Sequence, residues 1–136
     1  EVTIDENSQI GPSARLRPKT KIGKKTKIGN FVEIKNSKIG NNVSIAHLSY
    51  IGDAVIGNNV NIGAGTITCN YDGKKKHKTL IKDNVFIGSN SSIIAPIIIE
   101  SKSKIGAGSV ITKNIPKNSL AIARSALKIL RNKGSK

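Results

Sequence analysis

The stretch "KIGKKTKIGNFVEI", residues 21–34, decides the fold, because an isoleucine recurs in it every six residues. Ile22, Ile28 and Ile34 mark the repeat, and Gly23 and Gly29 directly follow the first two. A period of six fits neither a helix, with about 3.6 residues per turn, nor a half-buried strand, which alternates about every two residues. It fits a short strand followed by a turn, with the isoleucine pointing inward each time. The repeat therefore predicts a solenoid.

The same spacing runs through most of the chain of 136 residues. The aliphatic positions are Ile4, Ile10, Leu16, Ile22, Ile28, Ile34, Ile39, Ile45, Ile51, Ile56, Ile62, Ile81, Ile87, Ile93, Ile99, Ile105 and Ile111. Glycine follows nine of them, and we expect it to permit a bend that a side chain would resist. Three units close one triangular coil, so these seventeen positions predict about six stacked coils around an aliphatic column.

Composition limits the partners that the chain can have. Aromatic residues make up 3% and the formal charge is +15, which favours anionic small molecules over single-stranded nucleic acid, whose bases stack on aromatic side chains. No apolar run is long enough to cross a membrane, and no signal peptide opens the chain. Cys69 is the only cysteine, which excludes an intrachain disulfide. We expect a soluble cytoplasmic protein without a nucleic-acid or membrane partner. The missing initial methionine indicates a fragment.

The hexad pattern fades in "TKNIPKNSLAIARSALKILRNKGSK", residues 112–136. Pro116 is expected to end the last turn and Ser119 to cap a helix. The residues at helical spacing are Leu120, Ala123, Leu127 and Leu130. The sequence therefore predicts a β-solenoid domain over residues 1–116 and a short C-terminal helix with a basic tail over residues 117–136, which could cover the open end of the solenoid.

One step of the repeat is much longer than the others. From Ile62 to Ile81 the chain advances 19 residues, about 13 more than a hexad. Insertions in solenoids map to loops on one face, often the binding face. Asp72 and Gly73 mark a tight turn inside it. We expect residues 68–79 to project as a loop and to complete an active site that a bare prism lacks.

Two motifs carry a specific resemblance: "HLSY", residues 47–50, and "GAGTITCNYDG", residues 63–73. They resemble the acetyltransferase domain of the bacterial bifunctional N-acetylglucosamine-1-phosphate uridyltransferase / glucosamine-1-phosphate acetyltransferase family. The resemblance runs from "PSARLRP" to "LAIAR" and matches only the C-terminal part of the family protein. The uridyltransferase domain and the first coils have no counterpart here.

The resemblance implies the left-handed form of the parallel β-helix, since a period of six does not fix the hand. It implies transfer of acetyl from acetyl-CoA to the amine of glucosamine 1-phosphate, without a metal, for UDP-N-acetylglucosamine, peptidoglycan and lipopolysaccharide synthesis. A separate uridyltransferase is a possible partner. We also expect a homotrimer, because a cleft between subunits offers the pocket that a flat prism face lacks.

The resemblance also implies roles for individual residues. His47 is the expected base, because a neutral imidazole near physiological pH can accept the proton of the attacking amine. The expected phosphate- and sugar-binding residues are Arg17, Lys35, Tyr50, Asn61 and Lys76. The residues expected to line acetyl-CoA are Ala64, Asn70, Tyr71, Ser89, Ala107 and Arg124. Backbone N–H groups near Asn70 and Tyr71 are expected to receive the developing oxyanion.

Other interpretations stay open at this point. The chain could be a different hexapeptide-repeat acyltransferase, or an inactive structural relic. Cys69 lies next to Asn70, so a route through an acyl-cysteine has to be considered. A γ-class carbonic anhydrase shares the β-helix but needs three zinc-ligating histidines per site, and the chain has only His47 and His77, in dissimilar settings, which disfavours a metal site.

Overall fold

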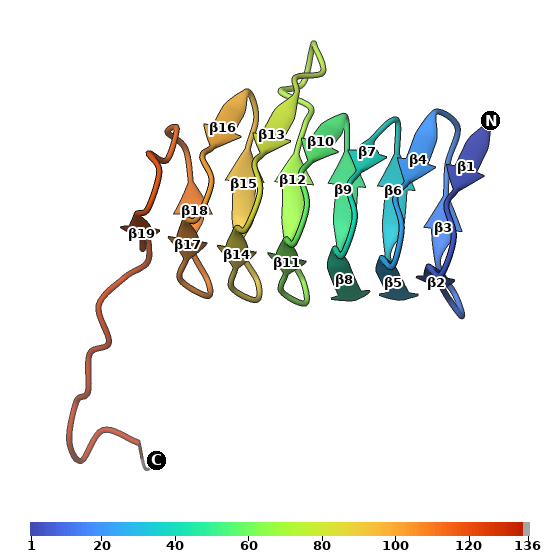
Figure 1. Cartoon of the computed structure of the whole chain (residues 1–136). Coiled ribbons are helices and arrows are strands. Elements are labelled where there is room, and N and C mark those ends of the chain that lie inside the picture. Colours follow the sequence, from blue (N-terminus) through green and yellow to red (C-terminus); the bar gives the residue numbers. More distant parts are fainter. Residues whose placement is uncertain (135–136) are drawn as a thin grey trace.

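The computed structural model describes residues 1–134, which form a three-sided prism of parallel strands (Figure 1). Sheet A contains β1 (Val2–Ile4), β4 (Thr20–Ile22), β7 (Lys38–Ile39), β10 (Ala54–Ile56), β13 (Thr79–Ile81) and β16 (Ile97–Ile99). Sheet B contains β2 (Gln9–Ile10), β5 (Lys27–Asn30), β8 (Ser44–His47), β11 (Asn61–Ile62), β14 (Phe86–Ile87), β17 (Lys104–Ile105) and β19 (Leu120–Ala121). Sheet C contains β3 (Arg15–Leu16), β6 (Glu33–Lys35), β9 (Tyr50–Gly52), β12 (Ile67–Cys69), β15 (Ser92–Ile94) and β18 (Val110–Ile111).

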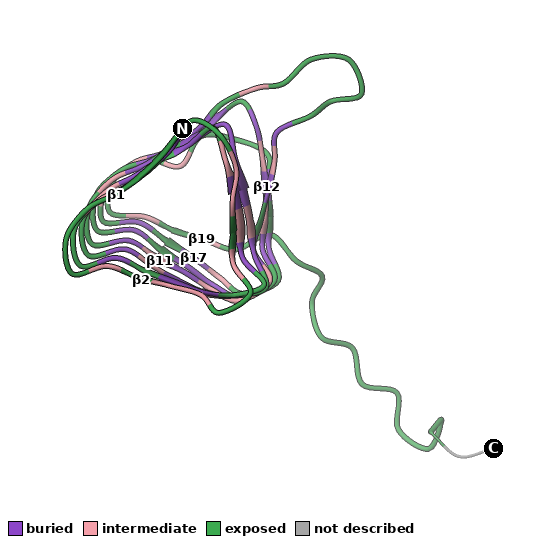
Figure 2. Ribbon diagram, turned by 90° about the vertical axis from the view of Figure 1, so that its right-hand side faces the viewer, coloured by how far each residue is buried: buried purple, intermediate pink, exposed green. Residues whose placement is uncertain are grey.

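The predicted aliphatic column forms the core. Ile28 is in register with Ile45, and Ile45 with Ile62, so isoleucine stacks on isoleucine along sheet B. The hexad side chains from Ile22 to Ile111 are almost fully buried, and Figure 2 shows the ribbon closing a triangle with buried segments along its sides. The left-handed parallel β-helix expected from the sequence is thus confirmed, with six coils and one further strand, β19, in sheet B.

The glycines have a different role from the one expected. Of the nine that follow an aliphatic residue, only Gly11 has a positive φ. A Cβ on Gly29 would lie 2.6 Å from the carbonyl carbon of Ala46, and one on Gly88 would lie 2.7 Å from Cα of Ala107. At these two positions glycine is needed because the next coil's backbone passes too close for a side chain. The left-handed bends fall mostly on asparagine, which tolerates that conformation.

The insertion is shorter than the sequence suggested. Thr68 occupies the inward position after Ile62 and is buried, so β12 continues the hexad pattern through Cys69. The Thr68 hydroxyl accepts a hydrogen bond from the Gly52 N–H at 2.8 Å, which allows a polar side chain at that position. The predicted boundaries of 68–79 were therefore too wide, since the projecting loop comprises residues 70–78.

The predicted C-terminal helix is wrong for the residues that the structure describes, since none of residues 117–134 is helical. Leu120 and Ala121 instead form β19 and pair with β17. The following residues extend away from the prism and do not cover its end (Figures 1 and 2). Leu127, Ile129 and Leu130 are 88%, 71% and 62% exposed, so an amphipathic helix would have no apolar surface to pack on in this chain. Across residues 1–134, no helix is long and apolar enough to span a membrane.

Candidate active site

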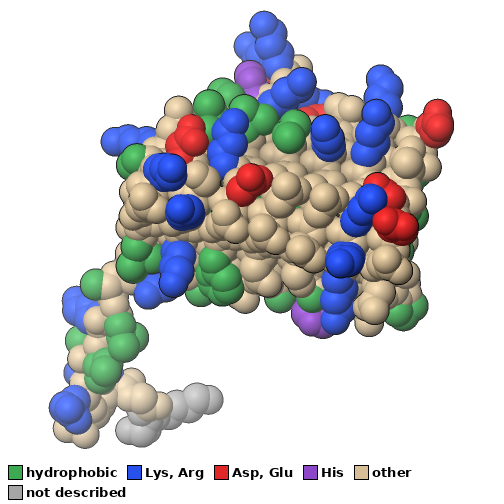
Figure 3. Space-filling view, in the orientation of Figure 1, with side chains coloured by type: hydrophobic (Ala, Val, Ile, Leu, Met, Phe, Trp, Pro, Cys, Tyr) green, Lys and Arg blue, Asp and Glu red, His purple; other side chains and the backbone are tan. Residues whose placement is uncertain are grey.

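A cavity of about 530 Å³ lies along the prism edge where each coil passes from sheet C to sheet A, which we call the C–A edge. Its lining consists of Arg17, Pro18, Lys19, Lys35, Asn36, Asp53, Lys76, His77 and Lys78. Five of these residues are Lys or Arg and one is Asp, so the lining is strongly cationic. The space-filling view shows basic side chains gathered along this upper edge of the molecule (Figure 3). An anionic ligand is the chemistry that the lining favours.

Asp53 organises one wall of this cavity. Its Oδ2 atom accepts hydrogen bonds from Nζ of Lys35 at 3.3 Å and from Nδ2 of Asn70 at 2.7 Å. Its Oδ1 atom accepts one from Nδ2 of Asn36 at 2.7 Å. Asn70 also lies 3.3 Å from the hydroxyl of Tyr50. The carboxylate therefore joins residues from three successive coils into one network.

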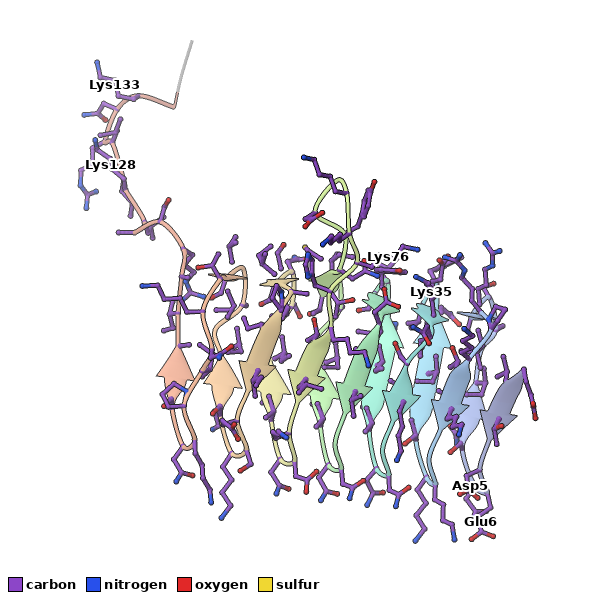
Figure 4. All side chains as sticks on the ribbon, turned by 90° about the horizontal axis from the view of Figure 1, so that it is seen from above. Asp5, Glu6, Lys35, Lys76, Lys128 and Lys133 are labelled. Carbon is purple, nitrogen blue, oxygen red and sulfur yellow. The ribbon has the colours of Figure 1, made fainter. Side chains whose placement is uncertain are left out.

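The charges in this network shift three pKa values. Burial alone would raise the pKa of Asp53, but hydrogen bonds from Asn36, Asn70 and Lys35 outweigh it and hold the pKa below its ordinary value. The contact with Lys76, reinforced by Asp53, raises the pKa of Lys35, and the same contact lowers the pKa of Lys76. Figure 4 shows the two lysines beside each other at this edge. The two ammonium groups therefore lie near one carboxylate, that of Asp53, which leaves an excess of positive charge at this edge.

Arg17 enters the same cavity already paired. Its guanidinium donates to Oε2 of Glu33 at 3.1 Å, and both side chains are partly exposed. Glu33 lies on β6, whose neighbour β3 ends just before Arg17. The ion pair fixes one side of the guanidinium, and the remaining N–H groups of the fork stay available for an anion.

The loop of residues 70–78 folds back on itself. Oδ1 of Asp72 accepts hydrogen bonds from the backbone N–H groups of Lys74 and Lys75, each at 2.7 Å, and its Oδ2 lies 2.7 Å from Nε2 of His77. The Lys75 N–H, His77 and the Lys74 N–H lower the pKa of Asp72 to about 2. The loop thereby places Lys76 over the cavity. The Tyr71 hydroxyl donates to the carbonyl of Gly73 within the loop.

A second group of predicted residues lies along the B–C edge, where each coil passes from sheet B to sheet C. His47 ends β8 and is exposed. Its carbonyl accepts from the N–H of Gly65, beside Ala64, at 3.3 Å. In the following coils, the Ala64 carbonyl accepts a hydrogen bond from the backbone N–H of Asn90, next to Ser89. The Ala107 carbonyl accepts one from the guanidinium of Arg124 at 2.6 Å. His47, Ala64, Ser89, Ala107 and Arg124 therefore form one column at successive coils.

The structure thus divides the predicted site between two edges of one chain. Arg17, Lys35, Asn70 and Lys76 lie at the C–A edge, and the Tyr50 side chain reaches them from sheet C. The His47 column lies at the B–C edge, and Asn61 begins β11 in sheet B. Tyr71 lies in the loop next to Asn70, so these two residues assigned to acetyl-CoA lie at the C–A edge, away from Ala64, Ser89, Ala107 and Arg124 at the B–C edge.

Sequence reasoning missed Asp53, Asn36, Lys19 and Lys78. The sequence signal for Asp53 was the scarcity of acidic residues, since the chain has only eight Asp and Glu residues and one of them follows Gly52 at a turn.

The alternative nucleophile Cys69 is partly buried at the end of β12, and burial raises the pKa of its thiol. A raised pKa leaves less thiolate, which disfavours an acyl-cysteine route.

Known proteins share this sequence and this architecture. The family model "GMPPB C-terminal domain" matches residues 1–71, and the model "Bacterial transferase hexapeptide (six repeats)" matches residues 78–113. The chain is 56% identical over 125 residues to the bifunctional protein GlmU of Acinetobacter baylyi and 64% identical over 125 residues to that of Thermodesulfovibrio yellowstonii. Each alignment covers 92% of this chain and 28% of the relative, so the chain spans under a third of these proteins' length.

Solved structures share the fold at low identity. A variant of AntD, an N-acyltransferase from Bacillus cereus in complex with dTDP-4-amino-4,6-dideoxyglucose and coenzyme A, has a TM-score of 0.82 at 20% identity and covers 94% of this chain and 82% of its own. The acetyltransferase domain of PglB from Neisseria gonorrhoeae has a TM-score of 0.77 at 20% identity and covers 85% of this chain and 54% of its own.

These structural similarities establish the fold alone, whereas the sequence matches establish kinship. The match to residues 1–71 covers more than half of the chain, and the predicted resemblance is confirmed by the GlmU relatives. The chain therefore belongs to the GMPPB C-terminal domain family and is kin to the hexapeptide-repeat acyltransferases through its similarity to the C-terminal region of GlmU.

Proposed function

We propose that the chain transfers acetyl from acetyl-CoA to the amine of glucosamine 1-phosphate, giving N-acetylglucosamine 1-phosphate for UDP-N-acetylglucosamine and cell-wall synthesis. The observation that carries this proposal is the cationic cavity at the C–A edge, with its Lys35–Asp53 and Arg17–Glu33 pairs. The similarity to the C-terminal region of GlmU supports it, as does the shared fold of AntD, an N-acyltransferase whose structure is a complex with dTDP-4-amino-4,6-dideoxyglucose and coenzyme A. A cytoplasmic location belongs to the same proposal.

The cavity supplies the binding site for the sugar phosphate. Arg17 presents a planar fork, and Lys35 and Lys76 supply two ammonium groups. A phosphate dianion between the two lysines would offset their mutual repulsion and raise the pKa of Lys76, which Lys35 lowers in the free protein. A charge-assisted hydrogen bond of this kind contributes about 1.5–3 kcal/mol where it is shielded from water, and less at the partly exposed Arg17. The Tyr50 hydroxyl lies beside Asn70 at the sugar end of the cavity.

His47 supplies the proton acceptor. As the neutral amine attacks the thioester carbonyl, its nitrogen forms a new C–N bond and His47 takes up the proton. The tetrahedral intermediate then collapses, the C–S bond breaks, and CoA leaves as a thiolate that is reprotonated. Backbone N–H groups near Asn70 and Tyr71 are proposed to receive the oxyanion, with about 3 kcal/mol per donor. The small residues Ala64 and Ala107 leave room for pantetheine against the edge of the solenoid.

The two edges explain why we propose a homotrimer. From His47 to Asp53 the chain crosses sheet C through β9, and six residues of extended chain span at most about 20 Å. His47 and Asp53 thus lie near the two ends of β9, on different edges of one chain. We propose that the His47 edge of one copy faces the C–A edge of another copy, so that one amino-sugar phosphate contacts both. Phe31 and Leu48 are 65% and 61% exposed on the His47 edge, which suits a surface covered by a neighbouring copy.

The proposal is tested by following acetyl-CoA consumption, with free CoA thiol as the readout and glucosamine 1-phosphate as acceptor. We expect turnover with glucosamine 1-phosphate that exceeds turnover with unphosphorylated glucosamine by about tenfold or more, because the phosphate ligands are then used. Equal rates with the two acceptors would contradict the anion site. No turnover with glucosamine 1-phosphate, but turnover with another amino sugar, would favour a different hexapeptide-repeat acyltransferase. Absence of any acetyl transfer would favour a structural relic. The presence of a separate uridyltransferase is tested by adding UTP and magnesium with candidate partner chains.

A further inference from the structure

Asp53 occupies a turn position that does not by itself require a carboxylate. It has a φ of 51°, and the corresponding turn residue one coil earlier, Asn36, has a φ of 46°. Asparagine and aspartate both tolerate this conformation, so either residue would serve the turn. Asn36 is exposed, whereas Asp53 is only 7% exposed, because the loop after β12 passes over it. A buried carboxylate is unfavourable unless it is well bonded, which points to a use for the charge.

Two of the three side-chain contacts of Asp53 go to the cavity-lining residues Lys35 and Asn36, and the third goes to Asn70 at the start of the loop. Lys35 and Asn70 share Oδ2, at 3.3 and 2.7 Å, and Asn36 binds Oδ1 at 2.7 Å. Lys35 comes from β6 and Asn70 from the residue after β12, so one oxygen fixes two side chains from coils that are not adjacent. A Cβ at Gly52 would lie 2.6 Å from Nδ2 of Asn70, so the glycine keeps open the space that this contact occupies.

The charge of Asp53 also controls where Lys35 points. Lys35 lies beside Lys76, whose ammonium group carries the same charge, and Arg17 lines the same cavity. Asp53 is the only acid that pairs with Lys35 among residues 1–134. Without that counter-charge, the ammonium would be free to turn toward solvent. The ion pair therefore holds Lys35 in the orientation in which it lines the cavity.

We propose that Asp53 is a positioning residue for acetyl transfer, which holds the Lys35 ammonium in place without itself contacting the acceptor. This inference rests on the proposed function, because it assigns Lys35 to the phosphate of the acceptor. Asp53 acts through Lys35, so its effect depends on Lys35 being present and on the acceptor carrying a phosphate.

The test uses Asp53→Asn, which keeps the size of the side chain and the turn. The new amide oxygen can still face Lys35 and Asn70 if the Asn36 amide rotates, so the variant removes mainly the charge. We expect kcat/KM with glucosamine 1-phosphate to fall about tenfold, as for a displaced binding group, and kcat/KM with glucosamine to change much less. In a Lys35→Met background, the same substitution should lower kcat/KM by less than about threefold, because interacting sites are not additive.

Asp83→Asn is the matched control. Oδ1 of Asp83 accepts from the Asn58 N–H at 2.7 Å on the edge between sheets A and B, and Asn58 and Asn41 make the same contact in the two preceding coils. An asparagine at 83 should therefore leave turnover and the melting temperature close to those of the parent. If Asp53→Asn loses activity equally with both acceptors, equally in the Lys35→Met background, and melts earlier, its role is structural and the proposal is overturned.

Calorimetric binding of glucosamine 1-phosphate separates this inference from the proposed reaction. If the parent binds the sugar phosphate but acetylates nothing, the proposed reaction fails. A Lys35-dependent loss of affinity in Asp53→Asn would then still support the positioning role. If the parent turns over glucosamine 1-phosphate but the losses of kcat/KM from Asp53→Asn and Lys35→Met are fully additive, the proposed reaction stands and the role of Asp53 is overturned. Absence of both binding and turnover in the parent would overturn both.

Discussion

Mixing two impaired variants would test whether one active site draws on two chains. His47→Ala removes the proposed base at the B–C edge, and Lys35→Met removes a phosphate ligand at the C–A edge. In a trimer, each site between neighbours would take His47 from one copy and Lys35 from the next. A site of the mixture is therefore intact only when the copy that supplies His47 is the Lys35→Met variant and the copy that supplies Lys35 is the His47→Ala variant.

The geometry fixes the size of the recovery. With equal amounts of the two variants and random assembly, each position is filled by either variant with equal chance, so about one site in four is intact. We expect the mixture, co-expressed with two different tags, to recover about a quarter of the parent turnover per site. Each variant alone should remain about 10²-fold or more (His47→Ala) and about tenfold (Lys35→Met) below the parent.

A mixture of the parent with the double variant His47→Ala/Lys35→Met provides the control. It should also retain about a quarter of the turnover if sites span two chains, but about half if each site lies within one chain. The assay is release of CoA thiol, with subunit ratios measured by mass spectrometry. Failure of the two single variants to complement, together with retention of half the turnover in the control, would refute the two-edge site.

Three further outcomes follow from the structure. His47→Ala should lower turnover by about 10²–10⁴ and leave acetyl-CoA affinity nearly unchanged; a folded variant within about threefold of the parent rate would remove His47 as the base. Gly29→Ala should lower the free energy of unfolding by about 1–3 kcal/mol or more, because its Cβ would meet the Ala46 backbone. Gly134→Ala, whose Cβ would point into open space, should leave it unchanged. Equal denaturant midpoints for the two variants would contradict this. Binding of glucosamine 1-phosphate at alkaline pH, below the ordinary lysine pKa of about 10.4, should be accompanied by proton uptake, because the bound phosphate raises the pKa of Lys76, which is lowered in the free protein. The heat of binding should therefore vary with the ionisation enthalpy of the buffer in the parent, and this variation should be lost in Lys76→Gln.

The sequence by itself determined the repeat and hence the core. Because Ile22, Ile28 and Ile34 recur at six residues, only a short strand with a turn can place each of them inside, and the stacking of coils follows. The sequence also indicated a projecting loop after Ile62, since an insertion in a solenoid adds no core packing. Motif resemblance then gave individual residues such as His47 and Lys35, whose roles remain predictions.

Only the tertiary structure decided which of these residues lie together. Residues six apart occupy different sides of the prism, and residues about 17 or 18 apart lie directly above one another, so the separation of His47 from Lys35 appears only once the coil is closed. The burial and three contacts of Asp53 depend on the loop passing over it, which a local pattern does not encode. The same holds for Leu120 and Ala121. Their spacing suits a helix, but an isolated short helix is only marginally stable in water. The edge of β17 instead offers backbone groups with which Leu120 and Ala121 pair.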